Sequence, residues 1–201
     1  MKTKKIVTLV LSLSIMMVLL NSCTTKAEVK TETITKSESE SWQSVLDNQL
    51  QELGHRNWIV IADSAYPAQN SDGITTIVTG EDQTSVLAYV LGQIENAKHV
   101  KPIIMVDKEL EYITDQEAPG IDAYKVELKK LISGKEVSNM PHIDIIEKLD
   151  EGSKLFKVVI LKTNMTIPYT SVFINLDCDY WSAEKEAALR AKIANSTTSL
   201  E

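Results

Sequence analysis

Four short runs of the chain are almost entirely apolar, and they constrain the fold more than any other feature of the sequence. They lie at residues 58–62, 102–106, 156–161 and 172–176, and each has the length of a β-strand. A strand that is apolar at nearly every position, without alternation, is buried on both faces of its sheet. The chain therefore predicts an α/β domain whose sheet is covered by helices on both sides.

Amphipathic helices are expected between these apolar runs, because apolar residues recur there at the spacing of one helix face. Gly54 follows the first of them, at the position where a glycine commonly ends a helix. Ser182 is a residue type that caps helices, and it should begin the last one. The expected helices cover residues 42–53, 84–94, 121–132 and 182–194, and two further strands cover residues 74–78 and 143–146.

The N-terminus has the pattern of a lipoprotein signal peptide over residues 1–22. Three lysines precede an apolar run at residues 6–20, which is shorter than the roughly 20 residues that a membrane-spanning helix needs. A cysteine directly behind Leu-Asn-Ser predicts cleavage before Cys23 and lipid attachment to its thiol. A plain membrane anchor and an ordinary secretory signal are the alternatives. The expected location is the bacterial cell envelope, with the protein anchored to a membrane by lipid.

The rest of the chain divides by composition. Residues 23–41 are rich in Thr, Ser, Lys and Glu and contain little that can be buried, which is typical of a flexible tether. Residues 42–195 have the length and apolar content of a single domain, and residues 196–201 form a short tail. We therefore expect one folded domain held at a distance from the membrane.

Charge and residue usage exclude several functions. The net charge is −7, and removal of the basic signal peptide would make the chain more acidic. An acidic chain without a basic stripe argues against nucleic acid and against anionic lipid surfaces, so the lipid alone should contact the membrane. With Cys23 lipidated, Cys178 has no partner for an internal disulfide. The histidines, His55, His99 and His142, show no ligand spacing, so no metal is predicted.

Polar residues that could carry chemistry follow the expected strands. Ligands of open α/β sheets bind at the carboxyl ends of the strands, and Asp63, Asp107 and Glu147 occupy such positions. His55 lies in the short link between the first helix and the first strand. The sequence contains no Gly-rich phosphate loop and no Gly-x-Ser-x-Gly motif. The residues alone therefore indicate a polar rim with a histidine and several acids.

Two segments resemble the D-ribose pyranase / L-fucose mutarotase family. Residues 53–67 contain Leu-Gly-His, then the apolar strand, then Asp-x-x-Tyr-Pro, which is similar to the family's opening motif. Residues 168–174, Pro-Tyr-Thr-Ser-Val-Phe-Ile, resemble the family's late Tyr-x-Asn and the strand after it. The resemblance extends over residues 44–178. It implies a single α/β domain with a mixed sheet and helices on both faces, and assembly into a ring-shaped homo-oligomer.

The resemblance also implies an activity. Members interconvert the ring forms or anomers of free monosaccharides, and they use no cofactor. The family's proton-donating histidine falls on His55 and its sugar-binding carboxylate on Asp63. These residue types suit the chemistry, because an imidazole can give or take a proton near neutral pH. A carboxylate can hold a sugar hydroxyl through charge-assisted hydrogen bonds.

The remaining pocket residues depart from the family pattern. The family's Tyr-x-Asn is replaced by a segment in which Tyr169 is kept and Ser171 stands in place of the amide. An ungapped count back from Tyr169 puts Glu147 where the family has a basic residue. The expected substrate-binding residues are thus Asp63, Glu147, Tyr169 and Ser171. A sugar isomerase with altered preference is favoured, and a non-catalytic sugar-binding lipoprotein associated with sugar uptake and a structural ring-forming protein are the alternatives.

Overall fold

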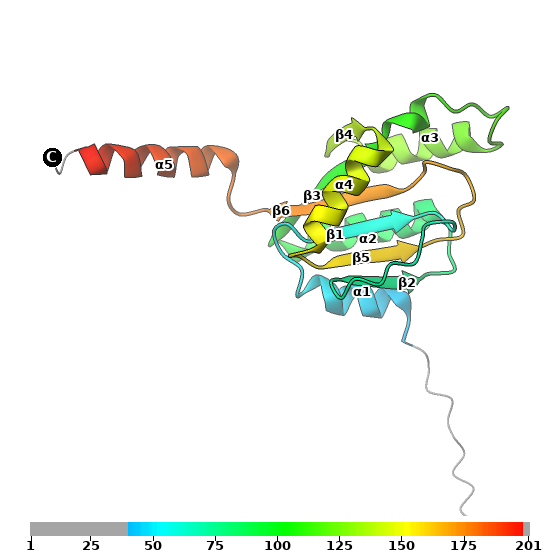
Figure 1. Cartoon of the computed structure of the whole chain (residues 1–201), viewed down its shortest axis with the longest axis horizontal. Helices are drawn as coiled ribbons and strands as arrows, with labels where there is room; N and C mark the ends of the chain where they lie inside the picture. Colours follow the sequence, from blue (N-terminus) through cyan, green and yellow to red (C-terminus); the bar gives the residue numbers. More distant parts are fainter. Residues whose placement is uncertain (1–39, 199–201) are drawn as a thin grey trace, which may run out of the picture. The chain divides into compact units, whose positions relative to one another are not determined.

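A six-stranded mixed sheet lies at the centre of the protein, for which a computed structural model describes residues 40–198 (Figure 1). The strand order is β2-β5-β1-β6-β3-β4, and only β6 is antiparallel to its neighbours. Val172 at the start of β6 therefore pairs with Ile61 on one side and Val106 on the other. The strands are β1 (Trp58–Ala62), β2 (Ile74–Val78), β3 (Val100–Asp107), β4 (Glu136–Met140), β5 (Val158–Lys162) and β6 (Val172–Cys178).

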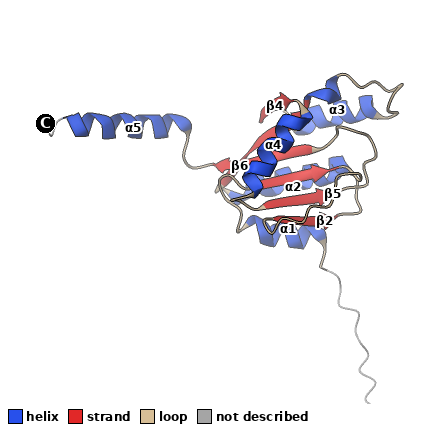
Figure 2. Cartoon of the chain, in the orientation of Figure 1, coloured by secondary structure: helices blue, strands red, loops and turns tan. Residues whose placement is uncertain are grey.

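Helices cover both faces of this sheet (Figure 2), which confirms the predicted fold class. Helices α1, α2 and α3 pack on one face, and α4 packs on the other, crossing in front of the sheet in Figure 1. Side chains of β1 point alternately to the two faces of the sheet. Ile59 and Ile61 belong to the hydrophobic cluster on one face, and Trp58 and Val60 belong to the cluster on the other. The helices are α1 (Trp42–Leu50), α2 (Gln83–Ala97), α3 (Ile121–Leu131), α4 (His142–Ser153) and α5 (Ala183–Thr198).

Burial of β1 explains its uninterrupted apolar sequence. All five of its residues are buried, because helices cover both faces of the sheet at this point. Each aliphatic side chain removed from water stabilises the fold by about 1.5–3 kcal/mol. The strand thereby fixes the positions of the two short segments that flank it, residues 53–57 and 63–67.

The prediction of a strand at residues 143–146 is wrong, because these residues lie in the first turns of helix α4. Ile145 and Leu149 are four residues apart, lie on one helix face and are both fully buried against the sheet. The strand that pairs with β3 is instead β4, which the sequence did not indicate. It is polar and exposed at most positions, as is common for a strand at the edge of a sheet.

The link between α1 and β1 also differs from expectation. Helix α1 ends at Leu50, three residues before the predicted end, and Gly54 does not adopt a left-handed conformation. Its backbone N–H donates to Asn57 Oδ1 at 2.7 Å, and Arg56 takes the positive φ of 74°. His55 is therefore held in a tight turn at the amino end of β1.

The ends of the described chain agree in part with the expected boundaries. Ser41 caps α1, since its Oγ accepts from the backbone N–H of Ser44. The prediction that Ser182 caps the last helix is confirmed by its bond from the backbone of Lys185, and α5 continues to Thr198. The expected signal peptide, Cys23 and nearly all of the expected tether lie outside the described residues. Within residues 40–198, no helix is both long and apolar enough to cross a membrane.

Candidate functional site

Polar side chains gather at the edge of the sheet where the parallel strands end. Asp63 directly follows β1, Asp107 is the last residue of β3, and Ser171 directly precedes the antiparallel β6. Because β6 runs the other way, its start meets the ends of β1 and β3. A cleft of about 680 Å³ opens here, between the loop after β1, the first turn of α4 and the loop before β6. This is the usual place for a ligand in an open α/β sheet.

Asp63 lines the cleft with its carboxylate fixed from two sides. Ser171 Oγ donates to Oδ2 at 3.0 Å, and the backbone N–H of Ala65 donates to Oδ1 at 2.8 Å. Ser171 is itself buried and is not part of the cleft wall. The structure therefore places Asp63 in the cleft wall, whereas Ser171 orients that carboxylate from behind.

His142, at the start of α4, is the basic side chain of the cleft. Its Nδ1 lies 3.0 Å from Oδ1 of Asp107, which is only 1% exposed. A carboxylate accepts hydrogen bonds, so this contact puts the ring hydrogen on Nδ1 and leaves Nε2 available to a ligand. The backbone N–H of His142 also donates to both carboxylate oxygens of Glu109, at 3.1 and 3.0 Å. His142 is thus held by hydrogen bonds of its ring and of its backbone N–H.

Asp107 is an unusual partner, because it is a carboxyl group inside the protein. Burial raises its pKa, against the hydrogen bond and charge of His142, which lower it. Its second oxygen, Oδ2, is buried and has no hydrogen-bond partner among the described residues. Such a group is costly for folding. Its position therefore suggests a role in fixing His142 rather than in stability.

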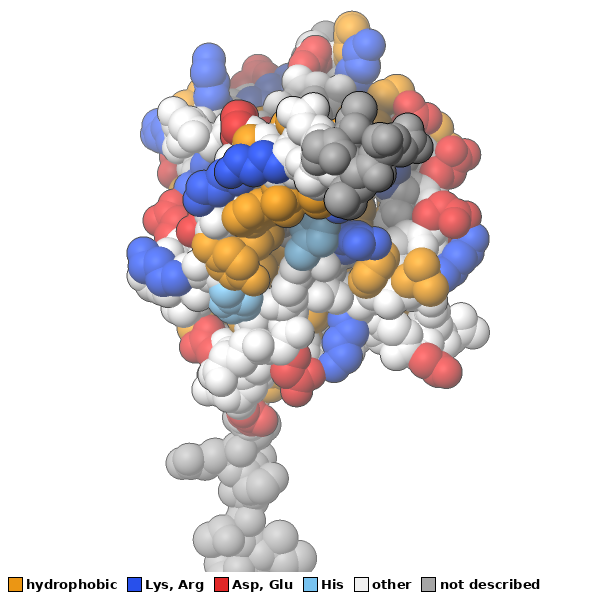
Figure 3. All heavy atoms as spheres, turned by 90° about the vertical axis from the view of Figure 1, so that its left-hand side faces the viewer, with side chains coloured by type: hydrophobic (Ala, Val, Ile, Leu, Met, Phe, Trp, Pro, Cys, Tyr) orange, Lys and Arg blue, Asp and Glu red, His pale blue; other side chains and the backbone are white. Residues whose placement is uncertain are grey.

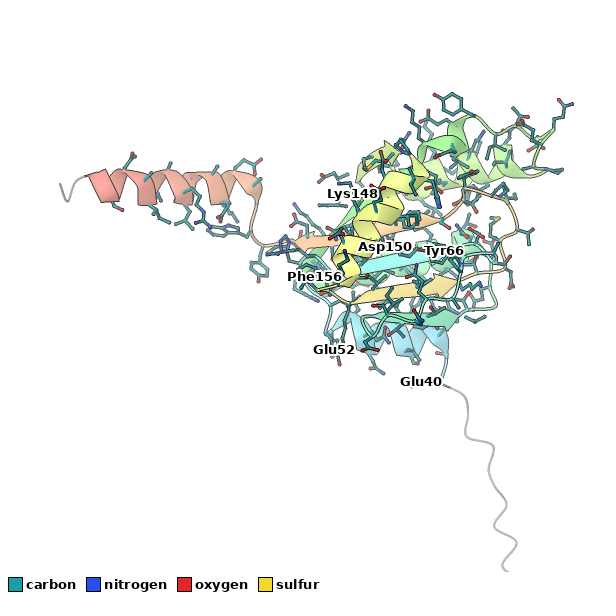
Figure 4. All side chains as sticks on the ribbon, viewed as in Figure 1. Glu40, Glu52, Tyr66, Lys148, Asp150 and Phe156 are labelled. Atoms are coloured by element: carbon teal, nitrogen blue, oxygen red, sulfur yellow. The ribbon has the colours of Figure 1, made fainter. Side chains whose placement is uncertain are left out.

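Two tyrosines complete the cleft. Tyr169 adopts a left-handed conformation, with a φ of 58°, and its ring meets the His142 ring edge to face at 5.7 Å. Tyr66, on the loop after β1 (Figure 4), is buried, and its hydroxyl forms no hydrogen bond of standard geometry among the described residues. Burial, followed by the charges of nearby acids such as Asp150, raises its pKa to about 12, against a smaller opposing effect of Gln69. Tyr66 therefore keeps its proton at neutral pH.

His55 lies at the opposite end of β1 from this cleft. Five strand residues at roughly 3.3 Å each put the backbones of His55 and Asp63 on the order of 15 Å apart. His55 contacts Asp177 instead, with Nδ1 at 2.9 Å from Oδ1, and Lys101 reaches the same carboxylate at 3.3 Å. One monosaccharide cannot touch both predicted residues within a single chain.

Comparison with known proteins identifies the family. Residues 36–177 match the sequence profile of the RbsD / FucU transport protein family. The chain belongs to this family. The matched segment contains α1 to α4 and nearly all of the sheet, and it leaves α5 outside. A sequence comparison with curated proteins finds no match.

Solved structures of RbsD and FucU proteins are similar to this chain at low identity. Bacillus subtilis RbsD complexed with D-ribose is 20% identical, with a TM-score of 0.49, and the match covers 67% of this chain and 92% of that one. The fucose mutarotase from Streptococcus pneumoniae, in complex with L-fucose, is 18% identical over 68% and 92% of the two chains, with a TM-score of 0.46. FucU from Bifidobacterium longum is 16% identical over 66% and 93%, with a TM-score of 0.45.

Glu147 does not lie where the ungapped count from Tyr169 put it. It is an exposed residue in the middle of α4 and lines a different groove of about 840 Å³, together with Lys148 and Phe156, which are labelled in Figure 4. His142, one and a half turns earlier on the helix, is the basic residue beside Tyr169. An ungapped count does not locate the basic residue, because His142, and not Glu147, lies against Tyr169 in the fold.

The sequence indicates part of this cleft. Asp63 and Tyr169, both expected at a sugar site, line it, and Asp107 lies at the same edge of the sheet. His142 and Tyr66 also line it, although neither is among the residues expected there. A helical signal for α4 was present in the spacing of its apolar residues, and it would have put His142 at a helix start near the strand ends. Within residues 40–198, no group of three or more His, Cys, Asp or Glu side chains could hold a metal ion.

Proposed function

We propose that this chain binds a free monosaccharide in the cleft at the carboxyl edge of the sheet and interconverts its ring forms or anomers. Membership of the RbsD / FucU family supports a sugar as ligand, as do the D-ribose and L-fucose named with two similar structures. The observation that carries the proposal is the pairing of His142 with buried Asp107 in the same cleft as Asp63.

The reaction needs only proton transfers. A base removes the proton of the anomeric hydroxyl, an acid protonates the ring oxygen, the bond between the anomeric carbon and the ring oxygen breaks, and a carbonyl forms. Closure by the reverse steps gives the other anomer, or another ring form when a different hydroxyl attacks. Nothing is oxidised or reduced. Nε2 of His142 can take the first proton, and the imidazolium that results can deliver a proton to the ring oxygen.

The other residues of the cleft hold the sugar. Oriented by Ser171 and by the backbone of Ala65, Asp63 can accept hydrogen bonds from sugar hydroxyls. Tyr169 offers an exposed ring to the C–H bonds of the sugar and also contacts the imidazole. This division leaves His142 as the group at the reacting atoms.

His55 enters the proposal through a second copy of the chain. It is too far from Asp63 to share a sugar within one chain, yet its side chain is 54% exposed and Asp177 holds its ring. We infer that the protein is a homo-oligomer in which His55 of one copy reaches the cleft of another. The same separation supports the alternative of a sugar-binding protein without turnover, in which His55 stays apart from the cleft.

Exchange NMR on the full chain tests the function, with D-ribose, L-fucose and other free aldoses as probes. Transfer of saturation between anomer or ring-form signals, faster than in buffer, shows turnover. Saturation transferred from protein to sugar without faster exchange shows binding alone and supports the non-catalytic alternative. Neither effect with any aldose would overturn both readings and favour a structural role.

We also propose that the domain is exported to the bacterial cell envelope and anchored by lipid on Cys23. The signal-peptide pattern of residues 1–22 and the Leu-Asn-Ser-Cys boundary support this. Replacement Cys23→Ser should leave an unprocessed chain that no longer partitions into detergent as a lipoprotein. Identical mass and partitioning of the variant and the wild type would rule out the anchor.

A further inference from the structure

The C-terminal segment of this chain brings aromatic side chains to His55. The family match ends at residue 177, and the next residues lead through Tyr180 and Trp181 into α5. Both rings are exposed, Tyr180 by 69% and Trp181 by 42%. A cleft of about 580 Å³ lies between this segment and His55. Figure 3 views the left-hand side of Figure 1, where β6 ends, and shows hydrophobic side chains beside histidine side chains on that face.

Local hydrogen bonds fix the geometry of this segment. The indole Nε1–H of Trp181 donates to Glu186 Oε2 at 2.8 Å, so the first turn of α5 holds the ring. Lys185 Nζ donates to the backbone carbonyl of Tyr180 at 3.2 Å, and Ser182 caps the helix that presents both partners. The segment is tied to the domain by the backbone N–H of Asp179, which donates to the carbonyl of His99 at 3.3 Å. The indole ring of Trp181 and the backbone of Tyr180 are therefore held in place.

The state of His55 in this cleft follows from its partner. Burial would raise the pKa of Asp177, but the backbone N–H of Cys178 and the hydrogen bond and charge of Lys101 outweigh it and lower the pKa. Asp177 is thus ionised at neutral pH and accepts the Nδ1 hydrogen of His55. Nε2 remains for a ligand, in the cleft that Tyr180 and Trp181 also line.

We propose that Tyr180 and Trp181 form an aromatic wall of the sugar site beside His55, and that this wall makes the chain prefer sugars in the pyranose form. The inference rests on the proposed function, which brings His55 to the sugar. A pyranose with equatorial hydroxyls gathers its axial C–H bonds on the two ring faces, and a flat indole packs well against such a face. The wall comes from residues outside the family match, so it belongs to this chain's own extension.

The three tryptophans of the chain allow a direct test. Trp42 and Trp58 are 8% and 6% exposed, so quenching of fluorescence by acrylamide in the full chain reports mainly on Trp181. A pyranose-forming aldose that binds the wild type should reduce this quenching. Replacement Trp181→Ala should weaken its binding by roughly 2- to 10-fold, the usual range for an aromatic contact, while Trp181→Phe should keep most of the affinity. Tyr112→Ala is the matched control, because Tyr112 is 70% exposed and does not line this cleft.

The outcomes separate the inference from the proposed function. Protection of Trp181, weaker binding by Trp181→Ala and unchanged binding by Tyr112→Ala support the aromatic wall. If the wild type binds an aldose but Trp181 is equally quenched and Trp181→Ala binds as well, the wall is wrong and the proposed function stands. A change of molar mass in Trp181→Ala without a change of affinity would make the rings a subunit contact and overturn the inference. If no aldose binds the wild type, both proposals fall.

Discussion

The two ends of β1 carry polar groups of different kinds. At the carboxyl end, Asp63 is hydrogen-bonded to Ser171 in the loop before β6, and buried Asp107 of β3 is hydrogen-bonded to His142 of α4. At the amino end, His55 is exposed and pairs with Asp177 near a segment that the family match does not include. Sheet topology brings the groups at the carboxyl end together, since β6 runs against its neighbours, whereas His55 at the amino end shares a cleft with the segment that follows β6.

The largest expected effect concerns His142 at the carboxyl end. Replacement His142→Ala should lower the sugar exchange rate by roughly 10²–10⁴, the contribution of a positioned acid–base group. Thermal stability at pH 7 should also fall, because buried Asp107 loses its hydrogen bond from His142. Ile143→Ala is the control, since Ile143 is exposed on the same turn of α4. Exchange NMR measures the rates, and equal rates in both variants would remove His142 from the reaction.

The next effect tests whether the two ends meet across copies. Each of the variants His55→Ala and Asp63→Asn should, by itself, exchange sugar forms much more slowly than the wild type. Mixed in equal amounts and allowed to exchange subunits, they should recover roughly a quarter of wild-type exchange, because about one contact in four pairs two intact residues. Two samples of the same variant, mixed in the same way, are the control. Absence of recovery in a mixture shown to contain mixed oligomers would mean that the two ends act separately.

A smaller effect is expected for Asp107→Asn, with opposite signs for activity and stability. Burial raises the pKa of Asp107 in the folded protein. Asp107 therefore contributes favourably to the free energy of unfolding at a pH below its pKa in the unfolded chain, and this contribution is lost as the pH rises through its pKa in the folded protein. At pH 7 the variant should therefore melt higher than the wild type, and the gap should narrow toward pH 3–4. Its exchange rate should fall, by less than in His142→Ala, because the imidazole loses its charged partner.

Thermal melts across this pH range and exchange NMR at pH 7 measure both quantities. The same melts on Asp72→Asn, which changes an exposed carboxylate in the turn before β2, provide the control. A variant that is less stable than the wild type at pH 7, with unchanged exchange, would make Asp107 a structural residue.

The smallest effect is expected for Glu147→Gln. Glu147 is exposed on α4 and lines a groove apart from Asp63 and Tyr169, so affinity and exchange should match the wild type within error. Titrations of the variant and the wild type with two different aldoses test this expectation. A changed preference between the two sugars would show that Glu147 contributes to the sugar site.

The predictable part of the fold shows which signals are local. The β1 run was recognised because all five residues are apolar and both faces are covered, and α2 and α3 were recognised from helical spacing. The first turns of α4 were misread because Ile143, Ile145 and Ile146 favour a strand when a window of four residues is taken alone. The polar strand β4 gave no signal, since its place in the sheet depends on pairing with β3.

Strand burial and short motifs are properties of neighbouring residues, so the α/β class and the family could be predicted from the sequence alone. Which polar groups share a cleft became visible only in the folded chain. Asp63 and Ser171 are 108 positions apart, and His142 and Asp107 are 35 apart. Pairings over such distances depend on strand order and direction, and no periodicity within a segment encodes them. For the same physical reason the structure, and not the motif, separated His55 from Asp63 by the length of a strand.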